Sequence, residues 1–293
     1  MLEQKSFDVT GWSAESQKIL ENIKAGQWIF PPDPTEISAS IGGMVSCNAS
    51  GAKTFFYGPT RNYVEAIRAV LPGGDVIAVR RGSSMALGRD FNLVTESGRH
   101  ITGHLPSYTV PKVKSAAGYY IDENMDLIDL FIGAEGTLGV ITEIELKLVK
   151  APAMRIGTVA FLQDRQSALV LVRALRKEAL PEGTSPLPVL PLSIEYFDRR
   201  ALALLKDQQQ SNPAFSQLQP LPDGTPEAVY AEFDGADDDK AWEILSGLGT
   251  LVERSGGNEH DTWVALDGQK MEKLRFFRLP GMCKHPGRPM PQK

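Results

Sequence analysis

Two short segments combine glycine with small and polar residues in a pattern that could hold a ligand through the backbone. The first, ASIGGMVSCNASG at residues 39–51, follows a proline-rich segment, and the second, GAEGTLG at residues 133–139, has Glu135 available to accept hydrogen bonds. Glycine lets the backbone approach a ligand that a side chain would exclude, and exposed amides suit a diphosphate. Neither segment matches the GxGxxG or GxxxxGK[ST] phosphate-binding patterns. The first alone is equally compatible with a tight turn that serves only packing, and for the second a glycine-rich reversal is the alternative.

Other familiar kinds of site find little support in the sequence. Cys47 and Cys283 lie far apart in dissimilar surroundings, so neither a disulfide framework nor a thiolate metal site is predicted. The run Asp237 to Asp239 lacks the alternating ligands and glycine turn of a calcium loop, and we expect a solvated loop. Serines such as Ser46 have no nucleophile elbow around them. The histidines are scattered and are expected to be ordinary surface or core residues: His100, His104, His260 and His285.

Length, composition and net charge indicate the number of domains and the kind of partner. The chain has 293 residues, of which 42% are hydrophobic and 23% charged, which is enough for a sizeable core and suggests two domains. A net charge of -5 without a basic stripe argues against nucleic acid, and small molecules or proteins are the expected partners. No signal peptide or run of about 20 apolar residues occurs. We expect a cytoplasmic protein, with peripheral docking at the inner membrane left open.

The residues up to 150 alternate between helical and extended patterns. A helix is expected over 13–25 with Ser13 as its cap, whereas the prolines of FPPDPT at 30–35 exclude both helix and central strand because they fix φ and remove amide donors. Periodicity and turn signals predict the following elements: a helix over 62–70, a turn at 72–75, a strand over 76–79, a helix around 127–131 and a strand over 140–149.

A second α+β unit is expected to begin at Ala151-Pro152. The same reasoning predicts strands over 158–161, 228–233 and 263–266, helices over 165–179 and 239–247, and surface loops over 181–191 and 207–226. The chain as a whole is therefore expected to be α+β.

Taken together and in order, several motifs resemble one family of flavoproteins. They are FPPDPT, SIGGMVSCNASGA, YGPTR at 57–61, LPSYTVPKVKSAAGYY at 105–120 and DLFIGAEGTLGVITEIELKL at 129–148. Their order and spacing resemble the FAD-linked oxidases, the superfamily of vanillyl-alcohol oxidase and p-cresol methylhydroxylase, in its glycolate and D-lactate dehydrogenase branch. The resemblance is close over residues 28–150. It continues loosely to about residue 278, through LSIEYFDRRALALL and KLRFFR.

The resemblance implies a fold and a cofactor site. Residues 1–150 would form the second half of a PCMH-type FAD-binding domain, and residues 151–293 a partial substrate domain of antiparallel sheet plus helices, with 279–293 a disordered tail. FAD would be bound noncovalently. The residues that match the family's FAD-lining segments are Pro32, Asp33, Ile41, Gly42, Gly43, Ser46, Asn48, Glu135, Gly136, Gly139, Val140 and Ile141. Met44 stands where many relatives carry Asn, and Tyr57 and Arg61 are expected to brace the fold.

The resemblance also implies a reaction, oxidation of a 2-hydroxy acid such as glycolate or D-lactate at Cα, with hydride transfer to flavin N5 and an unknown electron acceptor. It assigns no catalytic residue and no metal ligand. The family's Arg-Gly-Gly-Gly-Thr-like loop and its histidine-rich segment are not found, which predicts a gene truncated at both ends. Two alternatives stay open: a transferase like alkylglycerone-phosphate synthase, which uses the same flavin fold, and a non-catalytic fragment or a subunit completed by another chain.

Overall fold

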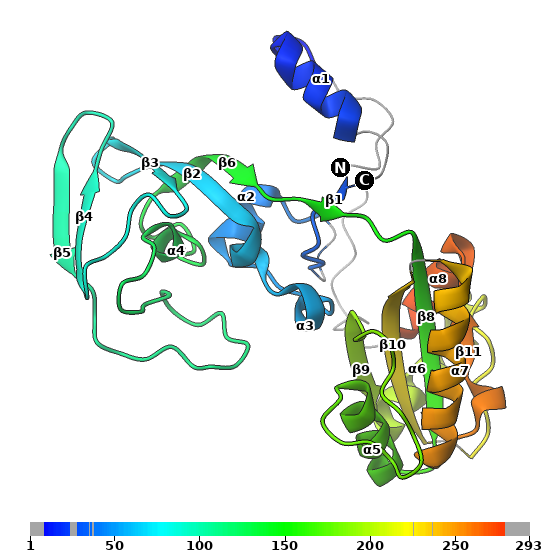
Figure 1. Cartoon of the computed structure of the whole chain (residues 1–293). Helices are drawn as coiled ribbons and strands as arrows, with labels where there is room; N and C mark the ends of the chain where they lie inside the picture. Colours follow the sequence, from blue (N-terminus) through cyan, green and yellow to red (C-terminus); the bar gives the residue numbers. More distant parts are fainter. Residues whose placement is uncertain are drawn as a thin grey trace. The chain divides into compact units, whose positions relative to one another are not determined.

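The computed structural model describes residues 9–23, 28–34, 36, 38–224, 226–235 and 237–278. The chain divides into two compact units, of which the first ends at Ala151 and the second begins at Pro152 (Figure 1). The expected end of the first helix at residue 25, the expected tail over 279–293, and with it Cys283 and His285, lie outside the described residues.

The first unit contains short helices and small antiparallel sheets. The first helix, α1 (Ala14–Ile23), begins as predicted, because the Ser13 hydroxyl accepts a hydrogen bond from the Ser16 amide at 3.1 Å. The proline segment that follows β1 is irregular, as expected, and forms one bridge with Gly51 at Pro34. The remaining elements outside its main sheet are β1 (Trp28–Ile29) paired with β7 (Val149–Lys150), α2 (Ile41–Ser46), α3 (Thr54–Tyr57), η1 (Thr60–Tyr63) and α4 (Ile128–Phe131).

The main sheet of the first unit has three antiparallel strands in the order β3-β2-β6. These are β2 (Val64–Val70), β3 (Val76–Arg80) and β6 (Val140–Leu146), and a separate hairpin joins β4 (Asp90–Val94) to β5 (His100–His104). Side chains of the sheet pack against α4, which confirms the predicted helix around 127–131. The turn at 72–75 is also confirmed, with the Leu71 amide donating to the Asp75 carbonyl at 2.8 Å.

The predicted helix over 62–70 is wrong, because residues 64–70 form β2, the central strand of this sheet. The pairing of β2 with β6 shifts register between Val64 and Ala66 and again between Arg68 and Ala69. Each irregularity changes which face the following side chains occupy, so the buried positions fall at Val64, Ile67 and Ala69 rather than at every second residue. The first two buried residues, Val64 and Ile67, are three positions apart, which is close to the period of a helix.

The second unit is a four-stranded antiparallel sheet covered by helices on both faces. Its strands run in the order β11-β8-β10-β9, with bounds β8 (Met154–Leu162), β9 (Ser193–Phe197), β10 (Glu227–Gly235) and β11 (Trp263–Ala265). The helices are α5 (Arg165–Leu175), α6 (Arg199–Ser211), α7 (Asp238–Arg254) and α8 (Gly268–Arg275), with 3-10 turns η2 (Pro213–Phe215), η3 (Glu259–Asp261) and η4 (Phe276–Arg278).

Alternation along the central strands directs side chains into two cores. From β10, Val229 and Phe233 pack with α5 and α7, whereas Ala228 and Tyr230 pack with α6 and the segment that ends at Phe277. The strands predicted over 158–161 and 228–233 lie within β8 and β10, and that over 263–266 covers β11. Because both faces of the sheet are buried, β8 and β10 each contain a short unbroken apolar run, Val159–Leu162 and Ala228–Ala231.

Several boundaries in the second unit differ from the prediction. The loop expected over 207–226 begins only after Ser211, since α6 continues through polar residues of good helix propensity while Leu202 and Leu205 anchor it in the core. The helix expected over 165–179 ends at Leu175, and the helix expected over 239–247 extends over the whole of α7. The expected solvated loop at 237–239 is wrong in part, because Asp237 caps α7 and the other two aspartates form its first turn, where negative charge is favourable.

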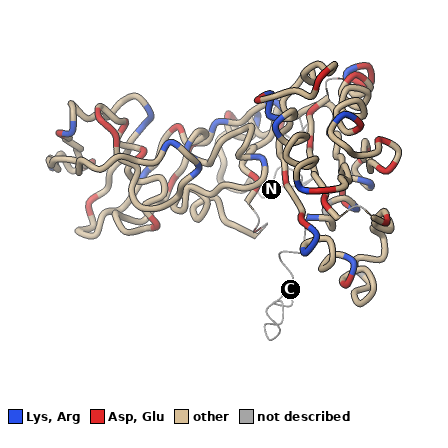
Figure 2. The backbone as a smooth tube through the Cα atoms, turned by 90° about the horizontal axis from the view of Figure 1, so that it is seen from below, with Lys and Arg blue, Asp and Glu red and all other residues tan. Residues whose placement is uncertain are grey.

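Charge is interspersed over the described residues of both units, where Figure 2 shows basic and acidic residues alternating along the backbone without a basic stripe. On the exposed side of the three-stranded sheet, Arg68 pairs with Glu96 at 2.7 Å and with Glu143 at 2.9 Å. Exposed pairs of this kind add little stability. In the described part of the chain, none of the helices has the length and apolar character needed to cross a membrane.

Candidate functional site

The first glycine-rich segment folds into the short helix α2 rather than an open loop. Ser40 is extended, with φ -72° and ψ 152°, and its hydroxyl accepts a hydrogen bond from the Gly43 amide at 3.0 Å, so this amide is used by the helix cap. Within the described residues, the amides of Ile41 and Gly42 have no hydrogen-bond partner. A Cβ built on Gly42 would meet no atom within 4 Å. The backbone at Gly42 is therefore open on its outer side.

The second glycine-rich segment forms a turn that holds the end of α2. Its backbone is left-handed at Gly133 (φ 90°), Glu135 (φ 52°) and Gly136 (φ 76°). The Gly133 amide donates to the Val45 carbonyl at 3.0 Å, and the Glu135 amide donates to the Ser46 carbonyl at 2.8 Å. The last carbonyls of a helix have no hydrogen-bond donors within the helix. Here two amides of the turn donate to the last two carbonyls of α2. The two segments that the sequence predicted to act together are thus in direct contact.

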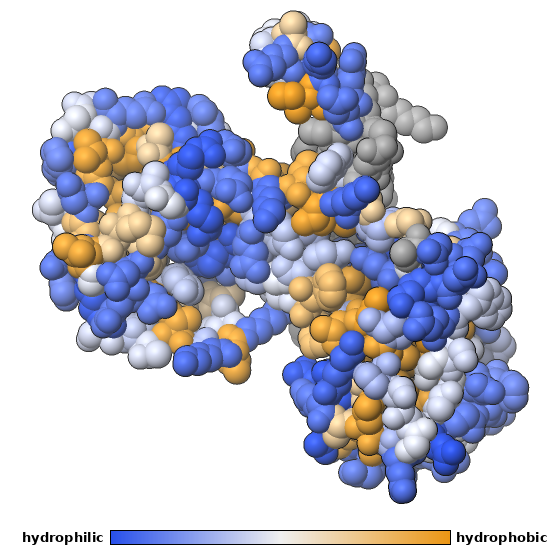
Figure 3. Space-filling view, viewed as in Figure 1, coloured by the Kyte–Doolittle hydropathy of each residue, from blue (hydrophilic) through white to orange (hydrophobic). Residues whose placement is uncertain are grey.

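The end of this turn and the first residues of β6 lie beside α2 and include one exposed apolar side chain. A Cβ on Gly139 would lie 2.6 Å from the carbonyl oxygen of Val70, so a glycine is required where β6 begins to pair with β2. Val140 is 67% exposed, whereas Ile141 packs against the core. Helix α2 contacts β6 (Figure 1). Figure 3 shows further apolar side chains at the surface of the first unit, and Val140 is one of the exposed ones.

Pro32 and Asp33 lie in a neighbouring segment that reaches this region through Gly51. The bridge between Pro34 and Gly51 brings the chains so close that a Cβ on Gly51 would lie 1.5 Å from the Asp33 carbonyl oxygen. The carboxylate of Asp33 pairs with Lys53 at 3.5 Å. Pro32 is buried and Asp33 is half-buried. Pro32 and Asp33 therefore lie close to the residues that come after α2 in the chain. Neither belongs to the junction between the two glycine-rich segments.

A buried carboxylate, that of Asp129, binds two arginines close to the junction. Asp129 accepts hydrogen bonds from Arg61 at 2.9 Å and from Arg81 at 3.0 Å, with only 12% of its side chain exposed. Burial lowers the pKa of Arg61 and the pair with Asp129 opposes that shift, whereas the hydrogen bonds to Asp129 raise the pKa of Arg81. The expectation that Arg61 braces the fold is confirmed. The sequence reasoning missed Asp129, although a carboxylate inside the apolar run of α4 indicates a buried cation partner.

Asn48 and Tyr57 also have structural partners. Asn48 is left-handed, with φ 46°, and its side-chain oxygen accepts a hydrogen bond from the Arg61 amide at 3.0 Å. The carbonyl of Tyr57 accepts a hydrogen bond from the Tyr63 hydroxyl at 2.8 Å, as expected of a residue that braces the fold. Ser46 contributes its carbonyl to the junction, while the carboxylate of Glu135 faces solvent. Asn48 thus ties the end of the first glycine-rich segment to Arg61.

The remaining candidates do not assemble a second site among the described residues. His104 pairs with Asp90 at 2.7 Å and His100 contacts Asn92 at 3.0 Å, both on the exposed hairpin β4–β5. Within the part of the chain that the structure describes, no three His, Cys, Asp or Glu side chains come together in a way that could hold a metal ion.

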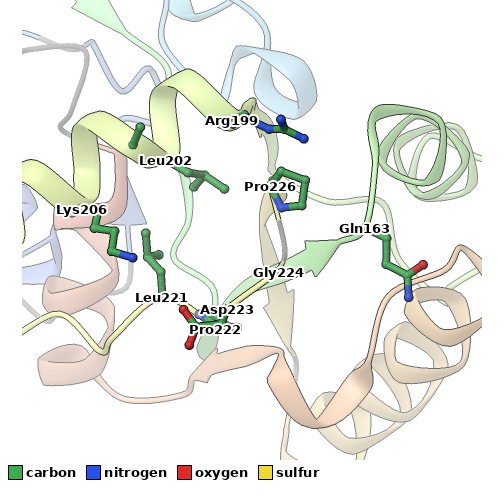
Figure 4. A pocket seen from close by; sticks show the side chains of 10 residues that line it. Gln163, Arg199, Leu202, Lys206, Leu221, Pro222, Asp223, Gly224 and Pro226 are labelled. Carbon is green, nitrogen blue, oxygen red and sulfur yellow. The ribbon is translucent and has the colours of Figure 1, made fainter.

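An open groove of about 470 Å³ lies in the second unit, between α6 and residues 221–224 (Figure 4). Arg199 and Lys206 reach it from α6, and Leu202 forms part of its apolar wall. None of the FAD-lining residues predicted from the sequence lines this groove. The groove and the glycine-rich junction are therefore separate features.

The class of domain follows from comparison with known families. Residues 13–80, which include α2 and the segment from Pro32 to Gly51, match the family model described as an FAD binding domain. A solved structure of alkyldihydroxyacetonephosphate synthase is similar in fold, with a TM-score of 0.50 and 15% sequence identity, over 89% of this chain and 40% of that chain. The expected α+β fold and the prediction of FAD as the cofactor of this domain family are confirmed.

Curated relatives narrow the class further. The chain is 27% identical over 233 residues to a D-lactate dehydrogenase of Anaerostipes hadrus, covering 78% of this chain and 38% of that protein. It is 29% identical over 190 residues to glycolate oxidase subunit GlcD of Bacillus subtilis, covering 64% of this chain and 31% of that protein. The chain is thus similar to a D-lactate dehydrogenase and to a glycolate oxidase subunit, as the motifs predicted. It spans less than two fifths of the length of these two relatives.

Proposed function

We propose that this chain binds FAD noncovalently at the junction of α2 with the 133–139 turn, as part of an oxidoreductase that acts on a 2-hydroxy acid. The observation that carries the proposal is the pair of hydrogen bonds from Gly133 and Glu135 to the last carbonyls of α2. They bring together two segments, distant in sequence, that resemble FAD-lining segments of the FAD-linked oxidases. The names of the relatives, D-lactate dehydrogenase and glycolate oxidase, support the substrate class.

The surface of the junction is compatible with the cofactor. The open backbone at Gly42 leaves room for a diphosphate to approach, and the amides of Ile41 and Gly42 are donors of the kind that such a group accepts. The exposed side chain of Val140 offers an apolar contact for an aromatic ring system. When bound, FAD supplies the hydride acceptor, and the protein's part is to bind and orient it.

The second unit and a further subunit are the remaining parts of the proposal. The four-stranded sheet with helices on both faces is proposed as part of the substrate-side domain, consistent with the loose resemblance through LSIEYFDRRALALL and KLRFFR. A partner subunit is also proposed, and the name of the Bacillus subtilis relative, which is itself a subunit, supports such an association. The electron acceptor is left unassigned.

The first test is flavin uptake by the purified chain. After incubation with FAD and gel filtration, we expect the protein to carry visible flavin absorbance that denaturation releases into the filtrate. Under anaerobic conditions, D-lactate or glycolate should then bleach that absorbance. A chain that takes up no FAD would contradict the binding proposal, unless a co-purified partner subunit restores uptake. Stable flavin that neither hydroxy acid reduces would contradict the proposed substrates alone.

Gly42→Ala separates a cofactor role from a folding role. The added methyl group meets no protein atom, and alanine has a higher helix propensity than glycine, so the free energy of unfolding should stay equal or rise. The same methyl group should raise the Kd for FAD by about tenfold or more if the diphosphate approaches this backbone, which corresponds to about 1.4 kcal/mol.

Gly268→Ala is the matched control, because Gly268 lies in the first turn of α8 and its Cβ would also meet no atom within 4 Å. We expect Gly268→Ala to leave the Kd for FAD unchanged. Equal FAD affinity in both variants and in the unaltered chain, measured by flavin fluorescence titration, would remove Gly42 from the proposed site.

A further inference from the structure

One peptide group joins the two glycine-rich segments, and both of its polar atoms are held. This is the peptide between Ile132 and Gly133, directly after α4. Its N–H donates to the Val45 carbonyl at the end of α2 at 3.0 Å, and its carbonyl accepts a hydrogen bond from Arg61 Nη2. A peptide group is planar, so fixing the carbonyl also fixes the direction of the N–H. The guanidinium of Arg61 therefore orients one of the two hydrogen bonds that join the turn to α2, the bond from Gly133 to Val45.

Arg61 is itself held on every side. Its Nη1 donates to the carbonyl of Asp129 at 2.6 Å and to the carboxylate of Asp129 at 2.9 Å, and its guanidinium lies over the ring of Tyr120 at 4.5 Å. Its backbone amide donates to Asn48, which follows α2. A Cβ on Gly133 would lie 3.5 Å from Arg61 Nη2 and 3.2 Å from the Cβ of Asn48. Arg61 thus contacts residues of both segments.

The contacts require an arginine rather than a positive charge alone. A planar guanidinium donates in several fixed directions at once, and here it serves Asp129 and Ile132 together. A lysine ammonium is a point charge on a flexible chain and would keep the ion pair with Asp129 while losing the directed bond to Ile132.

We propose that Arg61 is a positioning residue for the FAD site, acting through the Ile132–Gly133 peptide to hold the 133–139 turn against α2. The inference rests on the proposed function for its consequence, the loss of FAD affinity. Its structural part, the holding of the turn, can be measured without cofactor. Arg61 reaches FAD only through that peptide and is not a catalytic residue.

The test compares Arg61→Lys with Arg81→Lys. Arg81 shares Asp129, donating to it at 3.0 Å and 3.1 Å, but its other bonds go to the carbonyls of Val64 and Arg61, outside both glycine-rich segments. Both variants weaken a bond to the same carboxylate, so both should lower the free energy of unfolding. Only Arg61→Lys should remove the hydrogen bond that holds the carbonyl of the Ile132–Gly133 peptide.

Two readouts decide the matter. Hydrogen exchange in the absence of FAD should show the Gly133 and Glu135 amides exchanging about tenfold faster in Arg61→Lys, and at the original rate, after correction for global unfolding, in Arg81→Lys. The Kd for FAD should rise on the order of tenfold in Arg61→Lys alone.

Equal exchange and equal affinity in the two variants would overturn the inference. So would rapid exchange of these two amides in the unaltered chain, which needs no variant to fold. Protected amides in a chain that binds no FAD would instead defeat the proposed function, while the role of Arg61 in holding the turn would stand.

Discussion

Gly51→Ala is expected to destabilise the first unit by about 3 kcal/mol, the upper end of the usual cost of overpacking. The reason is the 1.5 Å separation between a Cβ at this position and the carbonyl oxygen of Asp33, with the Asp33 carbonyl carbon only 2.5 Å away. These are backbone atoms, so no change of rotamer relieves the clash. The flanking prolines, Pro32 and Pro34, limit the ways in which the opposing segment can move.

Urea unfolding followed by circular dichroism measures this effect. Gly73→Ala is the control, since Gly73 lies in the turn before β3 with open space where its Cβ would be, and its change should stay within about 0.5 kcal/mol. The displaced segment carries Pro32 and Asp33, so FAD affinity should fall in Gly51→Ala but not in Gly73→Ala. A Gly51→Ala protein as stable as the unaltered chain would show that the two segments do not approach as closely as the structure indicates.

Phe277→Ala is expected to destabilise the second unit by about 3–5 kcal/mol, the usual cost of truncating a buried phenylalanine. The ring is fully buried and packs edge-on against Phe197 at 4.7 Å, Trp263 at 5.7 Å and Phe161 at 6.2 Å between centroids. These partners come from β9, β11 and β8, so the cavity left by the ring would open under three strands of the sheet at once.

The intrinsic fluorescence of Trp263, which contacts this ring directly, reports the loss. Trp242→Ala is the matched control, because Trp242 is 69% exposed on α7 and its removal should change stability by no more than about 0.5 kcal/mol. A loss below about 1 kcal/mol in Phe277→Ala would mean that the core under this face of the sheet closes around the missing ring.

The sequence predicted elements well where one period dominates. Strands β8 and β10 have apolar runs buried on both faces, and α7 has a regular apolar stripe. The prediction failed at β2, where two register shifts replace the alternation of buried and exposed residues with a helix-like spacing of buried residues. The hairpin β4–β5 gave no prediction, because its residues are mostly exposed and polar and carry few apolar side chains to mark a face.

The sequence predicted the two segments of the candidate site but not the hydrogen bonds that join them. Glycine content identified the segments around Gly42 and Gly136, since glycine is needed locally for open or left-handed backbone. No local signal indicates that the turn donates to the last carbonyls of α2, because that contact depends on packing between distant segments. Asp129 has a local signal, a carboxylate inside an apolar run, but its two arginine partners lie far earlier in the chain and no local pattern identifies them.

The hydrogen bonds from Gly133 and Glu135 to Val45 and Ser46 also bear on the order of folding. They join residues separated by most of the first unit, and contacts between such distant residues form slowly because a long loop must close first. During synthesis, α2 emerges well before the turn that caps it. The junction can therefore form only once the chain has been made as far as Glu135, when β2, β3 and α4 are already available to fold, so a cofactor that binds there would meet a first unit of which most has been synthesised.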